Sequence, residues 1–316
     1  MIVYINLLKK HMRTKKYPIT KLSNRNLTTS LRGIAILIIM IGHVGVSGFN
    51  CRVFNPCGGI GVAMFLFLSG YGICESYKCN GLKLFWTKKV LRIFVPYILW
   101  IPLYHAIMRL SPLAPSIEIP LFPSYWFIWY IFIWYLIFYI IFRFLSQNCS
   151  EIMCGIAIVL FLLFPNLQAE QSLSFIAGVL ISMHKDQFCK IEKKHILTIG
   201  IGLFLFGVSI LWIKQMPFIR EYELESFLFK CLNLLLKLSI GISLVLLFLC
   251  IRYKCNRYII FCGKISYELY LVHSFFYVTI ANNIQNLALF LVQSFVLAFL
   301  LFSISSNIKK RFNHKT

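Results

Sequence analysis

The sequence predicts an all-α protein, a polytopic membrane helix bundle of about ten transmembrane helices. Of its 316 residues, 59% are hydrophobic and only 13% are charged, so too little polar surface is available to cover a soluble domain. Apolar runs of the length that crosses a bilayer recur along the chain. Basic residues gather in alternate connections between these runs, as the positive-inside rule requires of a multi-pass membrane protein.

Ten apolar runs are the expected spans. The fifth and sixth are shorter than the roughly 17 to 25 residues that a span normally needs, so we expect them to be tilted, thin or re-entrant. The spans are residues 31–49, 58–77, 90–108, 126–145, 152–164, 173–183, 196–213, 231–251, 259–280 and 284–306.

The charge distribution predicts the orientation. The net charge of +22 comes from short connecting segments and not from one face, which argues against nucleic-acid binding. Lysine and arginine are concentrated in every second segment, which predicts that both termini are cytoplasmic. The expected organisation is a basic cytoplasmic arm (1–27), a transmembrane domain (28–308) and a basic cytoplasmic tail (309–316), held in the cytoplasmic membrane of the cell.

The eleven cysteines do not indicate a metal site, and no metal is expected. They form no Cys-x-x-Cys motif and no Cys/His spacing suited to zinc, and several lie inside apolar runs as small buried hydrophobes. Cys51 and Cys57 share one expected external loop, so a disulfide between them is an alternative to two free thiols.

The first span carries two ionisable side chains on one face. Arg32 and His43 are eleven residues apart, about three helical turns plus 20°. They lie roughly 16 Å apart along the axis, with Arg32 near a membrane surface and His43 near the middle of the bilayer. Because an ionisable group inside a bilayer is costly, each is a candidate for function. This separation is compatible with Arg32 and His43 acting at opposite ends of one substrate-binding path.

Histidine and arginine suggest different chemistry at those two ends. His43, with an ordinary pKa of about 6.5, is suited to accept a proton as a general base. Arg32 and Arg92 lie at the inner ends of the first and third spans, where planar guanidinium groups can bind phosphate or can simply anchor the helix. His273 shares a face of the ninth span with Tyr270. For both histidines, the structural alternative is a hydrogen bond to a backbone carbonyl.

Two further groups have a structural and a functional interpretation. Aromatic residues crowd the start of the fourth span, where Trp126 and Trp129 fit either an interfacial belt or a stacking surface for a sugar ring. Lys237 in the eighth span is a candidate partner for the charge of Glu268 in the ninth.

The order of the motifs resembles the acyltransferase family 3 of integral membrane proteins, many of which O-acetylate surface or exported glycans. The resemblance covers Thr28 to the C terminus and begins with the arginine, ten residues, histidine signature. The matches are Arg32-Gly33-Ile34-Ala35 with His43; Gly61-Val62, Phe65 and Phe67-Leu68-Ser69-Gly70-Tyr71; Lys89, Arg92-Ile93 and Pro96-Tyr97; Trp126-Phe127; and Ile265-Ser266-Tyr267 with Tyr270-Leu271-Val272-His273.

This resemblance implies transfer of an acyl group, most often acetyl, from cytoplasmic acyl-CoA to a hydroxyl group of a carbohydrate, which can be lipid-linked. Acetyl-CoA or another acyl-CoA is then a co-substrate, with no bound cofactor. His43 and Arg32 would be catalytic, and Arg32, Lys89 and Arg92 would hold the donor. The acceptor would contact Ser69, Tyr71, Trp126, Trp129, Tyr270 and His273.

The role of His43 has two versions, and the function has alternatives. His43 can act as the base or can carry the acyl group; we favour the base, because no second base or orienting carboxylate is evident beside it. The family usually has an acidic residue at the position of Thr29, which leaves room for a non-catalytic scaffold. A transporter or flippase of a lipid-linked glycan, relaying protons through its histidines, is the alternative from another class. Against it stands the small number of acidic residues.

Overall fold

The computed structural model describes residues 18–110, 125–145, 148–221, 226–251, 256–276 and 284–313. Every regular element in these ranges is a helix, which confirms the all-α class. Seven helical stretches are long and apolar enough to cross a membrane, so the protein is a multi-pass membrane protein. These stretches are built on α2 (Arg25–His43), α3 (Asn55–Asn80), α4 and α5 (Phe85–Lys89 and Val95–Leu110), α6 (Trp126–Phe144), α11 (Lys193–Ile213), α13 (Phe227–Cys250) and α16 (Ile284–Asn313).

Three of the ten predicted spans are not among these seven stretches. The fifth is α7 (Cys149–Leu163) and the sixth is α9 (Ser172–Met183), both short as expected. The ninth is broken at Ile265 into α14 (Arg257–Lys264) and α15 (Ser266–Phe276), and its predicted end at 277–280 lies outside the described residues. The count of ten spans and the cytoplasmic termini therefore stay predictions.

Short elements complete the described chain. They connect the long helices or extend their ends. They are the 3-10 turns η1 (Pro18–Ser23) and η3 (Arg52–Phe54), the π-helical turns η2 (Val44–Gly48) and η4 (Val90–Phe94), and the helices α8 (Asn166–Ala169), α10 (Lys185–Phe188) and α12 (Pro217–Arg220).

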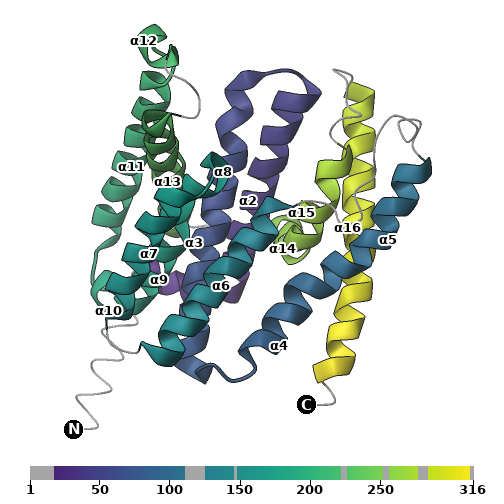
Figure 1. Cartoon of the computed structure of the whole chain (residues 1–316), viewed down its shortest axis with the longest axis horizontal. Coiled ribbons are helices and arrows are strands. Elements are labelled where there is room, and N and C mark those ends of the chain that lie inside the picture. The colour runs from purple at the N-terminus through teal and green to yellow at the C-terminus, as the bar shows by residue number, and fades with distance from the viewer. Residues whose placement is uncertain are drawn as a thin grey trace.

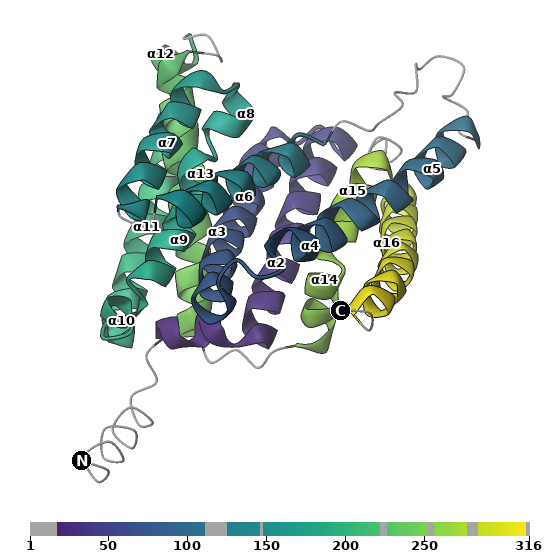
Figure 2. The same cartoon turned by 60° about the horizontal axis from the view of Figure 1, so that its bottom comes forward.

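Helices α2 and α3 stand in the middle of the bundle (Figure 1). Helix α3 packs against α2, α9 and α13, while α14 packs against α2 and α15 packs against α16. Helix α6 lies over α3, and the diagonal formed by α4 and α5 lies over α2 and α15 (Figure 2). This arrangement surrounds one face of α2 with α3, α6, the α4–α5 connection and α15. That face carries Arg32 and His43.

The start of α2 and the end of α16 lie at the same end of the bundle (Figure 1), and we call this the basic end. Helix α2 begins there because the side chain of Asn24 accepts hydrogen bonds from the backbone N–H groups of Asn26 and Leu27. Glu75 near the end of α3 pairs there with Lys185 of α10. Burial tends to lower the pKa of Lys185, but the hydrogen bond and the negative charge of Glu75 outweigh it and raise that pKa above its ordinary value.

Two π-helical turns interrupt the regular hydrogen bonding of the long helices. Helix α2 ends at His43 and continues as η2. Helix α4 passes through η4, which contains Arg92, into α5. Pro96 has no N–H to donate to the carbonyl group of Arg92, which accounts for the break at this point. Such turns are frequent at functional sites, and both lie at residues that the sequence singled out.

A glycine contact fixes α14 against α2. A Cβ atom on Gly263 would collide with the backbone carbonyl of Thr29, and one on Gly33 would collide with the carbonyl of Ile259. The two backbones touch because both positions are glycine. This contact sets where α15, which follows α14 directly, enters the bundle.

Two pairings considered from the sequence are absent from the structure. Lys237 pairs with Glu170 and not with Glu268, whose carboxylate accepts a hydrogen bond from Ser305 of α16. The sequence interpretation was wrong because Lys237 and Glu170 are 67 positions apart, and no pattern within one segment shows which carboxylate a lysine of another helix meets. Cys51 and Cys57 are both free thiols.

Candidate functional site

Three cavities follow one another through the middle of the bundle. The vestibule, at the basic end, has a volume of about 820 Å³. The basic cavity, of about 240 Å³, shares Lys88, Arg92 and two α15 residues with the vestibule. The histidine cavity, of about 350 Å³, shares Ile39, Val62 and Tyr270 with the basic cavity. Arg32 lines the basic cavity and His43 lines the histidine cavity, so the three spaces follow the face of α2 that the sequence indicated.

Four cations line the basic cavity, and we call them the cation cluster. They are Arg32 of α2, Lys88 and Lys89 of α4, and Arg92 of η4. None of the described residues that line this cavity is acidic. Like charges repel one another, and the repulsion is strong where water is partly excluded. The cavity therefore suits an anion that bridges several of these groups.

Arg32 lines the basic cavity and not the vestibule. It is half-buried, its guanidinium group packs beside Gly72 of α3, and its charge interacts with that of Arg92. The ion pairs found across the described ranges do not include Arg32. A planar guanidinium group in this setting is suited to bidentate binding of a phosphate.

Lys89 is held over an aromatic ring. Its ammonium nitrogen lies 4.2 Å from the centroid of the Tyr135 ring, which is on α6. Tyr135 also adjoins Ser69 of α3, and both line the basic cavity. The cation–π contact orients the ammonium group without neutralising its charge.

The histidine cavity contains both of the predicted intramembrane histidines. His43 Nδ1 lies 2.9 Å from His273 Nε2, with the ring planes 11° from parallel. His273 is completely buried, and its Nδ1 lies 2.8 Å from the carbonyl oxygen of Leu269. The interpretation of His273 as a residue bonded to a backbone carbonyl thus applies, but its second nitrogen contacts His43.

These contacts fix the tautomer of a neutral His43 ring. The carbonyl of Leu269 can only accept, so His273 Nδ1 carries a proton and donates. His273 Nε2 is then an acceptor, and His43 Nδ1–H donates to it. The lone pair of His43 is consequently on Nε2, the nitrogen that can take up a proton. His273 therefore orients His43. The sequence interpretation did not predict this contact.

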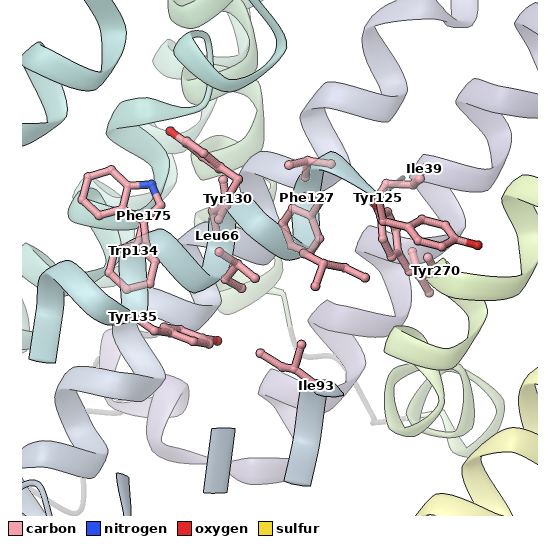
Figure 3. Packing of buried hydrophobic residues seen from close by; sticks show 14 of the residues in the cluster. Ile39, Leu66, Ile93, Tyr125, Phe127, Tyr130, Trp134, Tyr135, Phe175 and Tyr270 are labelled. Carbon is pink, nitrogen blue, oxygen red and sulfur yellow. The ribbon is translucent and has the colours of Figure 1, made fainter. Parts of the chain in front are cut away.

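Ile39, Val62 and Tyr270 line both the basic cavity and the histidine cavity, so these residues lie between the two. Figure 3 shows Ile39 and Tyr270 beside Tyr125, with Phe127 between them and the other aromatic side chains of α6. The rings of Tyr270 and Phe127 have centroids 5.2 Å apart. The region between the cation cluster and the histidines is therefore lined mostly by apolar and aromatic side chains.

Tyr125 fixes the position of α15 in this region. Its hydroxyl group donates to the carbonyl of Leu271 at 2.6 Å and accepts from Trp100 Nε1 at 2.8 Å. Through these two bonds, α5 and the start of α6 are connected to α15, the helix of His273.

Most of the predicted site residues line the basic cavity or the histidine cavity. Lys89, Arg92 and Ser69 line the basic cavity, Trp126 and His273 line the histidine cavity, and Tyr270 lines both. Two predicted residues lie elsewhere. The ring of Tyr71 is buried among a separate hydrophobic cluster, because two residues after Ser69 a helix has turned by about 200°. Trp129 is 54% exposed and contacts Phe94.

The sequence interpretation did not find Glu170, Gln171 and Tyr125, which line the histidine cavity. Glu170 and Gln171 are polar residues between two short apolar runs. That pattern carries no signal of a site, and only the tertiary structure shows that both side chains are buried. Tyr125 directly precedes the aromatic run at Trp126 and could have been included with it.

Helices of this length and apolarity, arranged around a cation-lined cavity and a hydrogen-bonded histidine pair, define a multi-pass membrane protein with polar groups inside its bundle. The family model of the acyltransferase domain matches residues 29–306. The chain therefore belongs to this family, acyltransferase family 3, and is a membrane acyltransferase by family. Comparisons with curated proteins and with solved structures give no match.

Proposed function

We propose that the protein is an O-acyltransferase of the cell membrane that moves an acetyl group from acetyl-CoA to a hydroxyl group of a surface or exported carbohydrate. The observation that carries the proposal is the order of the three cavities. A vestibule and a cation cluster suited to a phosphorylated donor are followed by a cavity that contains an oriented histidine, with Ile39, Val62 and Tyr270 between them. A donor with a phosphate-bearing head and a long uncharged arm that ends in a thioester fits this order.

The donor enters from the basic end, which is the cytoplasmic side in this proposal. Among the described residues, the vestibule is lined by cations from four parts of the chain, namely α2, the α4–η4 segment, α14 and α16, and by one carboxylate, that of Glu268. It accepts the nucleotide part of the coenzyme, while Arg32, Lys89 and Arg92 bind phosphate oxygens. The arm then passes Ile39 and Tyr270 and places the thioester beside His43, roughly 16 Å along α2 from Arg32.

His43 acts as a general base in the proposed reaction. Its Nε2 takes the proton of the acceptor hydroxyl while the hydroxyl oxygen attacks the carbonyl carbon of the thioester. The tetrahedral intermediate expels the thiolate by breaking the carbon–sulfur bond, and the His43 imidazolium returns the proton to that sulfur. The imidazolium is stabilised during this step because its Nδ1–H still donates to His273.

The contacts of His273 favour the base role of His43 over an acyl-histidine route. If His43 carried the acyl group, a second base would have to activate the acceptor. His273 is the nearby imidazole, but one of its nitrogens donates to Leu269 and the other accepts from His43. His273 is thus engaged as a positioning residue.

The first experiment measures transfer of label from radiolabelled acetyl-CoA into glycan in membrane vesicles of the source cells. His43→Ala is expected to lower transfer about 100-fold or more. CoA is expected to raise the melting temperature of both proteins, because the donor site remains. His195→Ala, an exposed histidine of α11, is the matched control and keeps full activity. Full activity in His43→Ala would refute the proposed role.

Arg32→Gln tests the donor site separately. Loss of a bidentate phosphate contact is expected to raise the KM for acetyl-CoA by about tenfold or more and to remove the thermal stabilisation by CoA. The unliganded variant should melt at a higher temperature than the wild type, because repulsion within the cation cluster is relieved. Arg143→Gln, at the exposed end of α6, is the control and leaves both quantities unchanged. An unchanged CoA effect in Arg32→Gln would contradict the assignment.

A further inference from the structure

A buried ion pair forms part of the wall of the histidine cavity. Lys237 of α13 pairs with Oε1 of Glu170, which caps the end of α8, and their side chains are 12% and 4% exposed. Both residues line the same cavity as His43. Charges are rarely buried to this extent in a membrane protein without a function.

One oxygen of this pair lacks a partner. Glu170 Oε2 is buried, and no group among the described residues donates a hydrogen bond to it. A buried acceptor left without a donor costs free energy, and a carboxylate oxygen costs more than a neutral one. Because Glu170 lines the cavity, a ligand there can supply the missing donor.

The surrounding residues hold the pair in place. Gln171, next to Glu170, donates a hydrogen bond from Nε2 to the carbonyl of Gly59 at 3.0 Å. A Cβ atom on Gly59 would collide with the side chain of Lys237, so glycine at this position makes room for the lysine to reach Glu170. Helices α3, α8 and α13 thus converge on a rigid polar group beside the reaction site.

We infer that Glu170 Oε2 accepts a hydrogen bond from a hydroxyl group of the acceptor, next to the hydroxyl that is acylated, and that Glu170 thereby selects a neutral polyol such as a sugar ring. This inference rests on the proposed function and adds to it the residue that recognises the acceptor in the same site. A carboxylate oxygen can only accept, so it requires an O–H or N–H group. Lys237 already balances the charge of Glu170, so a hydroxyl group fits this position better than an ammonium group, which would add an unbalanced buried charge.

The test uses a double variant that removes both charges together. Removing one partner alone leaves an unpaired buried charge, whereas replacing a buried pair by apolar side chains of similar volume is often tolerated. Glu170→Leu combined with Lys237→Met is therefore compared with the wild type in lipid nanodiscs. The donor is radiolabelled acetyl-CoA, and the acceptor probes are hexyl β-glucoside and 1-hexanol, which has a single hydroxyl group.

The wild type is expected to acetylate the glucoside more efficiently than the alcohol. The double variant is expected to raise the KM for the glucoside about tenfold or more, with transfer to 1-hexanol and stabilisation by CoA unchanged. Glu170→Asp, which keeps the charge but shortens its reach, is a second variant and raises the glucoside KM in the same direction. The matched control is Glu75→Leu with Lys185→Met. It removes an ion pair at the basic end, outside the histidine cavity, and keeps the wild-type KM.

Two results would overturn the inference and leave the proposed function intact. One is a glucoside KM that does not change in the double variant and in Glu170→Asp. Another is a wild type that CoA stabilises but that neither acetylates hexyl β-glucoside nor is stabilised by it. If the wild type is not stabilised by CoA and labels no glycan in source-cell vesicles, the proposed function itself is wrong.

Discussion

At the scale of single residues, the histidine pair decides what the site can do. His43 and His273 are 230 positions apart in the chain and share one hydrogen bond. The bond from His273 to the carbonyl of Leu269 makes His273 an acceptor toward His43, so a neutral His43 presents Nε2 for proton uptake. A residue that does not touch the reacting atoms thereby determines which nitrogen of His43 is basic.

His273→Ala is expected to lower kcat roughly tenfold to hundredfold, because a hydrogen bond to a group that becomes charged is worth about 1.5–3 kcal/mol. The KM for acetyl-CoA should not change, since the cation cluster is intact. His273→Gln supplies a carbonyl oxygen that can accept from His43 Nδ1–H and should recover part of kcat. Steady-state kinetics with acetyl-CoA check both expectations. If His273 had a purely structural role, the substitution would lower the melting temperature, and it would not lower kcat while leaving the KM for acetyl-CoA unchanged.

At the scale of elements, the contact between α2 and α14 positions the site. The glycines at 33 and 263 let the two backbones touch, and α15 follows α14 after a break of one residue. Helix α15 supplies His273, Tyr270 and part of the vestibule. The place where α14 meets α2 thus determines whether His273 reaches His43.

Gly263→Ala tests this contact. A methyl group there would collide with the carbonyl of Thr29, so the helices must separate, at a cost of about 1–3 kcal/mol. We expect a lower melting temperature and a fall in transferase activity. Gly155→Ala on α7 is the control, because a Cβ atom there meets no neighbour within 4 Å. Its melting temperature should stay equal or rise, since alanine favours a helix over glycine. Equal effects of the two substitutions would argue against the contact.

At the scale of the whole molecule, the three cavities cross the bundle from the basic end toward the opposite end, where η2 and η3 lie. The proposed route for the donor requires the basic end to face the cytoplasm. The positive-inside rule favours this orientation, because the lysine and arginine residues of the vestibule would then stay on the cytoplasmic side.

Cysteine labelling on intact cells checks the orientation. Cys79, exposed at the end of α3, should react with a membrane-impermeant maleimide only after the cells are permeabilised. Val53→Cys in a background without other cysteines should react on intact cells, because Val53 is 79% exposed near the opposite end. The reverse pattern would place the basic end outside and would exclude a cytoplasmic donor in the proposed position.

The sequence by itself determined the class of the protein and predicted Arg32 and His43, which line the basic and histidine cavities, as the two ends of the proposed site. Hydropathy is a property of consecutive residues, so the apolar runs predicted the seven long membrane helices, while the count of ten spans stays a prediction. The eleven-residue spacing placed Arg32 and His43 on one face because helical periodicity is local. The same periodicity could have shown that Tyr71 points away from the face of Ser69.

Only the tertiary structure decided which helices meet. The pairing of Lys237 with Glu170, the contact of His273 with His43 and the grouping of Arg32 with Arg92 each join separate helices. These contacts depend on how helices pack, and packing is set by glycine contacts and side-chain shapes that leave no periodic signal along one segment. The sequence pattern therefore predicts which residues lie on each helix, whereas the packing of the helices determines which residues each side chain contacts.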